Sequence, residues 1–118
     1  MTFYQYNLYH PLLDKNNEKH DSEYFADVYY GLSRLFLVVN EIDSAKLFIK
    51  RSIDYMLILV KDKNLEKEYL KRLTIAYRDF GWYRFSTDNF YKAHVSYEKA
   101  LETALKIHDS DSEIVAFL

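Results

Sequence analysis

Residues 77–101 read YRDFGWYRFSTDNFYKAHVSYEKAL, and they contain two apolar segments on either side of a short polar break at Ser86–Asn89. Each segment carries small residues among bulky ones, Gly81 in the first and Ala93 and Ala100 in the second. A small residue lets a neighbouring helix approach closely, and aromatic side chains then fill the space around the contact. We therefore expect two helices to pack side by side here, with four bulky residues around their contact: Tyr77, Phe80, Phe90 and Tyr97.

The composition of the whole chain favours a single all-α domain. A chain of 118 residues has the length of one domain, and its 49% hydrophobic content is enough to bury a core. Only two Gly and one Pro are present, which leaves little material for the turns of an all-β fold. We expect about four main helices.

The pattern of residues 77–101 occurs a second time, 48 residues earlier in the chain. Tyr29 precedes Tyr77 by 48 residues, and Ala45 precedes Ala93 by the same interval. Agreement at both landmarks indicates an internal repeat. Its earlier copy consists of Tyr29-x-x-Leu32-Ser33-x-x-Phe36, then Ala45-x-x-x-Ile49 and Ser52-Ile53.

An aromatic residue, a small residue and then Ala-x-x-x-aromatic in the following helix resemble the tetratricopeptide repeat (TPR), a helix–turn–helix unit. The resemblance implies antiparallel helix hairpins stacked as a right-handed array, in which the first helix of each repeat lines a concave surface. A unit of that family spans about 34 residues, so an interval of 48 leaves roughly 14 more per repeat. We expect this extra length in long second and third helices, joined by a hairpin at Lys61–Asn64.

Capping signals predict where the helices begin and end. The first helix should begin near Asp21 or Ser22, after a polar linker at 14–20, and end near Val39. The second should follow a capping box of Asn40 and Asp43 and end near Asp62; the third should follow Asn64, and the fourth should span about Asp88 to His108. The predicted divisions are an aromatic N-terminal arm with the polar linker (1–20), a helical domain (21–109, with repeats at about 21–62 and 64–108) and a short C-terminal capping segment (110–118).

An array of two repeats exposes an apolar face at each end, and helical arrays usually need three repeats for stability. One candidate cover is the N-terminal arm, where Pro11 disfavours a continuous helix. Another is the apolar tail Ile114–Leu118, which follows a capping box of Ser110 and Glu113. The third is a second copy of the chain, so a homodimer is a hypothesis with a physical motive.

Charge and hydropathy argue against nucleic-acid and membrane partners. Residues 1–45 carry three Lys or Arg against seven acidic residues, whereas residues 46–106 carry thirteen against eight. This excess is too small and too dispersed for a sequence-independent nucleic-acid footprint. No apolar run reaches membrane-spanning length, and the start lacks a basic region followed by an apolar run. We therefore expect a cytoplasmic protein.

Few residues suggest catalysis or cofactor binding. The absence of Cys excludes disulfides and thiolate metal sites, and both Gly are expected inside helices, so no phosphate-binding loop is predicted. None of the four His forms a metal pair at ligand spacing; His94 and Glu98, one helical turn apart, are expected to form a surface hydrogen bond. We expect no enzymatic activity, no cofactor, no metal and no small-molecule substrate.

The resemblance to TPR units instead implies a groove that binds a peptide or helix of another protein. Its core-facing positions map to Tyr29, Leu32, Ser33 and Phe36, and to Tyr77, Phe80 and Gly81. Its groove-facing positions map to Asp27, Tyr30, Arg34 and Leu37 in the first helix, and to Ile75, Arg78, Trp82 and Phe85 in the third.

Tyr, Trp and Arg often dominate binding energy, which supports this groove. An alternative is that Trp82 and Phe85 are core residues covered by the arm or the tail. Three functions stay open: a protein-binding adaptor, a dedicated single-partner chaperone or toxin-neutralising immunity protein, and, less favoured, an enzyme or nucleic-acid binder.

Overall fold

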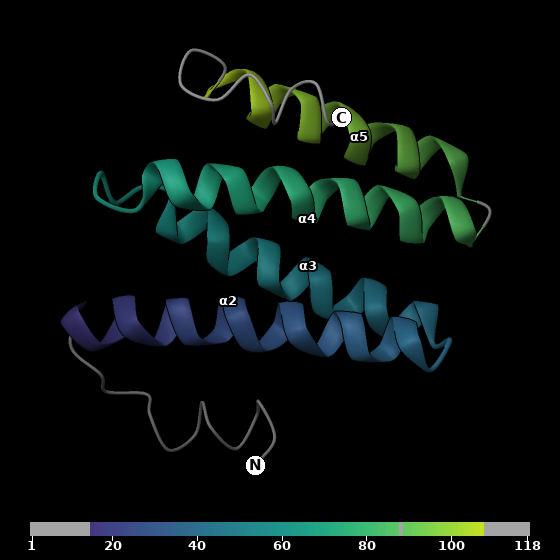
Figure 1. Ribbon diagram of the computed structural model, residues 1–118, viewed down its shortest axis with the longest axis horizontal. Helices are drawn as coiled ribbons and strands as arrows, with labels where there is room; N and C mark the ends of the chain where they lie inside the picture. The colour runs from purple at the N-terminus through teal and green to yellow at the C-terminus, as the bar shows by residue number, and fades with distance from the viewer. Residues whose placement is uncertain (1–14, 88, 108–118) are drawn as a thin grey trace.

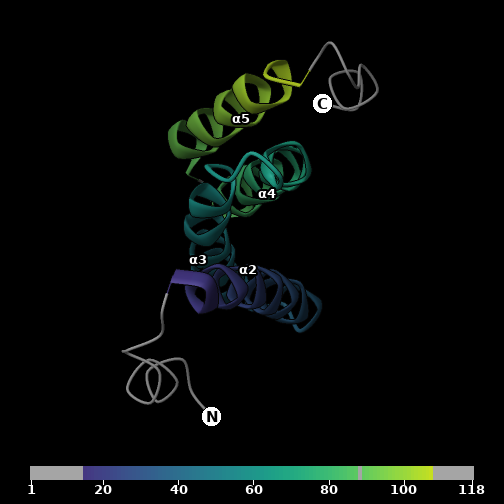
Figure 2. The same ribbon diagram turned by 90° about the vertical axis from the view of Figure 1, so that its left-hand side faces the viewer.

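The computed structural model describes residues 15–87 and 89–107, and every regular element in these two ranges is an α-helix. Helices that follow one another along the chain pack together and run in opposite directions, so that α2 and α4 run the same way (Figure 1). The view in Figure 2 shows the same succession from α2 to α5. The expected all-α fold is thus confirmed. The helices are α2 (Lys15–Val38), α3 (Ile42–Leu59), α4 (Glu66–Ser86) and α5 (Phe90–Leu105).

Helix α2 begins at Lys15, six residues before the predicted cap at Asp21. The predicted linker at 14–20 is therefore wrong from residue 15 onward. Lys, Glu and Asn can continue a helix, and no Gly or Pro interrupts this stretch. Lys19 Nζ also lies 3.1 Å from Asp62 Oδ2, which connects the early turns of α2 to the α3–α4 hairpin. Ser22 is buried inside the helix instead of capping it.

The turn between α2 and α3 differs from the capping box predicted for Asn40 and Asp43. Asn40 has a φ of 63°, in the left-handed region, and α3 has Glu41 at its N-cap with no side-chain cap bond. The N–H groups of Asn40 and Glu41 donate to the carbonyl oxygens of Leu37 (3.0 Å) and Phe36 (2.8 Å). This pair of bonds is the Schellman motif that ends a helix, and Asn is the residue besides Gly that commonly adopts its left-handed position. Asn40 therefore stops α2 instead of starting α3.

The other helix ends lie close to their predicted positions. Helix α3 ends at Leu59, and in the hairpin that follows the Asp62 carboxylate accepts a 2.9 Å bond from the N–H of Asn64. Helix α5 begins at Phe90, where the side chain of the N-cap Asn89 accepts a bond from the N–H of Lys92. The polar breaks predicted from these residues are confirmed.

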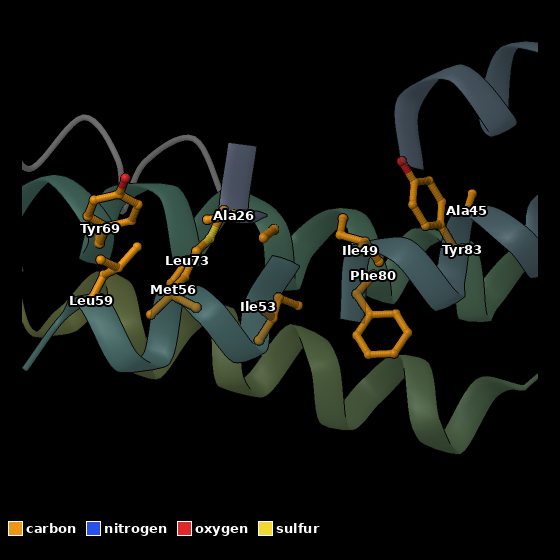
Figure 3. Packing of buried hydrophobic residues seen from close by; sticks show 11 residues of the cluster. Ala26, Ala45, Ile49, Ile53, Met56, Leu59, Tyr69, Leu73, Phe80 and Tyr83 are labelled. Atoms are coloured by element: carbon orange, nitrogen blue, oxygen red, sulfur yellow. The ribbon is translucent and has the colours of Figure 1, made fainter. Parts of the chain in front are cut away.

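The core lies between the helices and combines aliphatic and aromatic side chains with alanines (Figure 3). Gly81 is buried beside Tyr97 of α5, as the sequence predicts. Phe90 is instead 59% exposed, so its predicted place in this helix contact is wrong. It is the first residue of α5 and its ring lies against Phe85. The main buried cluster consists of Ala26, Ala45, Ile49, Ile53, Met56, Leu59, Tyr69, Leu73, Ala76, Phe80 and Tyr83.

Several predictions concern residues outside the described ranges. They are the cover formed by the N-terminal arm or the tail, the capping box of Ser110 and Glu113, and the fourth helix's limits at Asp88 and His108. Across the described part of the chain, no helix combines the length and the apolar character needed to cross a membrane.

Candidate partner-binding groove

Two polar contacts connect α2 to α4 across the face predicted to form the groove. Arg72 Nη1 lies 2.6 Å from Asp27 Oδ1, and the Tyr30 hydroxyl donates a 2.9 Å hydrogen bond to Asp79 Oδ2. Because the two helices run the same way, these contacts fix their register at two places about two helical turns apart along α4. Side chains on the facing sides of α2 and α4 are therefore held in a defined arrangement.

A hollow of about 210 Å³ lies at this junction. Three of its lining residues, Asp27, Tyr30 and Ile75, were predicted from the sequence as groove positions. The other described residues of the lining are Met56 of α3 and Arg72 of α4. The hollow thus combines an apolar side chain from the layer behind with charged and hydroxyl groups from the two groove helices.

Arg72 and Asp79 also lie at this junction, but they were not among the positions predicted from the sequence. Arg72 stands three residues before Ile75, and Asp79 four after it, so a helical spacing extended in both directions from Ile75 would have found them. Arg72 also lies 2.9 Å from Glu68 Oε1. Met56 gave no such signal, because it is a core residue of α3 that reaches the hollow from behind.

The tyrosine at this junction is held in its protonated form. Burial raises the pKa of Tyr30, and the nearby Asp79 carboxylate raises it further, because both disfavour a phenolate. The Arg34 guanidinium lies 6.0 Å from the centre of the Tyr30 ring, and Arg78 Nη2 lies 3.4 Å from Asp79 Oδ1. Tyr30 therefore remains a hydrogen-bond donor. The guanidinium groups of Arg34 and Arg78 both lie at this junction.

An aromatic cluster lies where α4 ends and α5 begins, by which we mean Trp82 and Phe85 of α4 and Phe90 of α5. The rings of Trp82 and Phe85 stack with centroids 6.0 Å apart, and Phe90 meets Phe85 edge to face at 5.1 Å. Trp82 is 55% exposed and Phe85 is 47% exposed, so these rings are open to solvent over about half of their surface. The helical spacing of Ile75, Trp82 and Phe85 puts the cluster on the same side of α4 as the hollow.

Leu37 is the predicted groove residue least connected to the others. It lies in the last turn of α2, is exposed and does not line the hollow. The remaining predicted positions form two sections, a polar one around Tyr30 and an aromatic one around Trp82.

The described ranges contain no metal-binding grouping. Within them, no three His, Asp or Glu residues converge as a metal site would require. His94 Nε2 lies 2.9 Å from Glu98 Oε1 on the exposed side of α5, which is the surface contact the sequence predicts.

Comparisons with protein-family models, with curated proteins and with solved structures gave no match.

Proposed function

We propose that this protein is a non-enzymatic binding module that holds a peptide or helix of a partner protein along the groove between α2 and α4. The observation that carries the proposal is the convergence of groove positions from two separate helices. Asp27, Tyr30 and Ile75 line one hollow, and the same side of α4 continues to the exposed aromatic cluster.

The residue types of this surface support a binding role. Trp, Tyr and Arg are the residues that most often dominate binding energy, because they bury a large rigid area and keep a polar contact. The rings of Trp82 and Phe85 stack on one another, and the Tyr30 hydroxyl is hydrogen-bonded to Asp79. Side chains that are already ordered lose less entropy when a partner binds, so such a surface favours affinity.

We also propose that the four helices are two TPR-like units. Residues 48 apart in the chain include pairs of small residues that are buried in both halves. A small side chain at a helix contact permits close packing. The two proposed units therefore allow close packing at corresponding positions. The pairs are Ser33 with Gly81, Ala45 with Ala93, and Ser52 with Ala100.

The proposal is tested by recovering partners from native cell extract with the tagged protein, followed by affinity measurements. Trp82→Ala and Arg78→Ala should each weaken binding by more than about 1 kcal/mol while the far-ultraviolet circular dichroism stays unchanged. Tyr91→Ala is the control, because Tyr91 is an exposed aromatic residue of α5 outside the groove. Unfolding of the Trp82 or Arg78 variant would mean that the side chain is structural and that the groove is wrongly assigned.

The stoichiometry of the recovered complex separates the two kinds of binding protein. A single partner at a fixed ratio in light scattering would identify a dedicated chaperone or an immunity protein. Several weak partners that compete for the same surface would identify a general adaptor. Equal binding by wild type and by both groove variants would overturn the groove itself.

A further inference from the structure

A second hollow lies away from the groove, where α3, the end of α4 and the start of α5 meet. Its volume is about 340 Å³, and none of the predicted groove residues lines it. Its lining includes four cationic side chains and one carboxylate. The residues are Asp43, Lys46, Leu47, Lys50, Phe80, Arg84, Asn89 and Lys92. We refer to it as the cationic hollow.

Arg84 is fixed in place at this hollow by neutral groups. Its guanidinium carbon lies 3.8 Å from the centre of the Phe80 ring, and its Nη1 donates to Ser96 Oγ at 2.7 Å and to the Lys92 carbonyl at 3.1 Å. Within the described ranges no carboxylate pairs with it. Burial lowers the pKa of Arg84, which reflects the cost of keeping an uncompensated charge there.

The guanidinium retains capacity for a ligand. It has five N–H donors in a planar fork, and its two hydrogen bonds to described residues are both made by Nη1. The Nη2 and Nε edge therefore has donors to offer. A pre-positioned guanidinium of this kind suits an oxyanion that accepts two parallel bonds.

The lysines around Arg84 add charge that the protein neutralises only in part. Lys46 Nζ lies 3.3 Å from Asp43 Oδ1 and donates to Thr87 Oγ1 at 3.2 Å, and the Asp43 side chain is 92% exposed. Lys50 and Lys92 are exposed and join no ion pair among the described residues. Among the described lining residues, four cations face one carboxylate, so three positive charges are in excess, and the cations come from three helices.

We propose that the cationic hollow is a binding site for a phosphate monoester. A phosphoryl group carries close to two negative charges near neutral pH and presents three acceptor oxygens, so it can meet Arg84 and the flanking lysines together. A single carboxylate offers one charge and two oxygens and would leave the excess unmatched. A nucleic-acid backbone needs cations spread along a stripe, whereas these surround one hollow.

The phosphoryl group can come from a phosphorylated side chain of a partner protein or from a small phosphorylated metabolite. Both sources share the chemistry that the hollow recognises. The cationic hollow shares no lining residue with the hollow between α2 and α4, and no predicted groove residue lines it.

The test is a titration of the full chain with inorganic phosphate, phosphoserine amide and adenosine monophosphate, followed by nuclear magnetic resonance at constant ionic strength. We expect saturable shifts of the amide signals of Lys46, Asn89 and Lys92. Tighter binding of phosphoserine amide than of adenosine monophosphate would support a modified protein as the source, and the reverse would support a metabolite.

Two charge-removing variants and a matched control make the test specific. Lys50→Gln and Lys92→Gln remove exposed ammonium groups and should each weaken binding about threefold, in line with one exposed charge pair. Lys67→Gln makes the same change on the exposed first turn of α4, away from the hollow, and should leave affinity unchanged.

The protonation of the ligand provides a second readout. Because the second pKa of a phosphate monoester is about 6, binding should be weaker at pH 5 than at pH 7.5. Shifts that do not saturate, or equal binding by wild type and the Lys50→Gln/Lys92→Gln double variant, would overturn the proposal.

Discussion

The ring of Tyr97 lies so close to Gly81 that a Cβ atom at position 81 would stand 2.8 Å from the Cε1 atom of Tyr97. Real Cβ atoms essentially never approach another heavy atom so closely. Helices α4 and α5 therefore meet at a distance that only Gly permits here without a shift of the Tyr97 ring. The sequence predicts this contact, because Gly81 stands among bulky residues opposite a helix that contains Ala93 and Ala100.

Substitution of the two glycines should change stability in opposite directions. Gly81→Leu should lower the free energy of unfolding by about 1–3 kcal/mol, because it overpacks the contact with Tyr97. Gly31→Ala is the matched control, since a Cβ at position 31 of α2 meets nothing within 4 Å. That variant should gain roughly 0.5–1 kcal/mol, because Ala favours a helix interior over Gly. Urea unfolding measures both values.

A double variant tests whether Tyr97 causes the effect. In a Tyr97→Ala background, Gly81→Leu should be tolerated better than in the wild type, since the ring that it meets is gone. An equal loss in both backgrounds would mean that the destabilisation has another origin.

The sequence predicted the helices and their close contacts better than it predicted where α2 begins. Small residues at a fixed interval, such as Ala45 and Ala93, indicate buried positions, because a large side chain does not fit a tight contact between helices. The start of α2 at Lys15 was missed because polar residues such as those at 15–20 occur both in linkers and in exposed helices. Phe90 was misplaced because aromatic character does not by itself distinguish a buried ring from an exposed one.

The candidate groove could be predicted only in part, for a related reason. The resemblance to TPR units put Asp27, Tyr30 and Ile75 among the groove-facing positions, and these three residues line one hollow. Two contacts join α2 to α4, one between Arg72 and Asp27 and one between Tyr30 and Asp79. The residues of these pairs are 45 and 49 positions apart in the chain, so both contacts depend on the register between the two helices. A spacing rule within one helix carries no information on that register.

The left-handed conformation of Asn40 yields a second prediction. Asn40→Ala should lower the free energy of unfolding by about 1 kcal/mol, because a side chain with a Cβ and no local polar group disfavours a φ of 63°. Asn40→Gly should be neutral or slightly stabilising, since Gly adopts this conformation without strain. Thermal unfolding of the two variants compares them directly. Equal effects of Ala and Gly would show that the side chain of Asn40, and not its backbone conformation, stabilises the turn.

Buried tyrosines should make the fold sensitive to alkaline pH. Burial, with a smaller contribution from Tyr55, raises the pKa of Tyr29 from 10.0 to about 12. Burial likewise raises the pKa of Tyr77 and Tyr83. In the unfolded chain these phenols ionise near pH 10, whereas in the folded chain they stay protonated. Folding stability is therefore fully present below pH 10 and falls as the pH rises from about 10 towards 12.

The melting temperature measured between pH 8 and pH 11.5 tests this dependence. Tyr29→Phe should show a shallower decline than the wild type, because one phenol that must stay protonated has been removed. Tyr91→Phe, at an exposed position of α5, is the control. A stability profile that is flat up to pH 11.5 would contradict the prediction.

The outer side of α5 is a candidate interface for the hypothesised self-association. Leu101 and Leu105, one turn apart, are 46% and 49% exposed, and α5 packs against α4 on its other side. If a second copy covers this face, light scattering at high protein concentration should give the mass of a dimer, and Leu101→Glu should shift it to the monomer because a buried carboxylate would lack a partner. Leu57→Glu introduces the same charge at an exposed position of α3 and should leave the mass unchanged. A wild-type protein that stays monomeric would reject this interface.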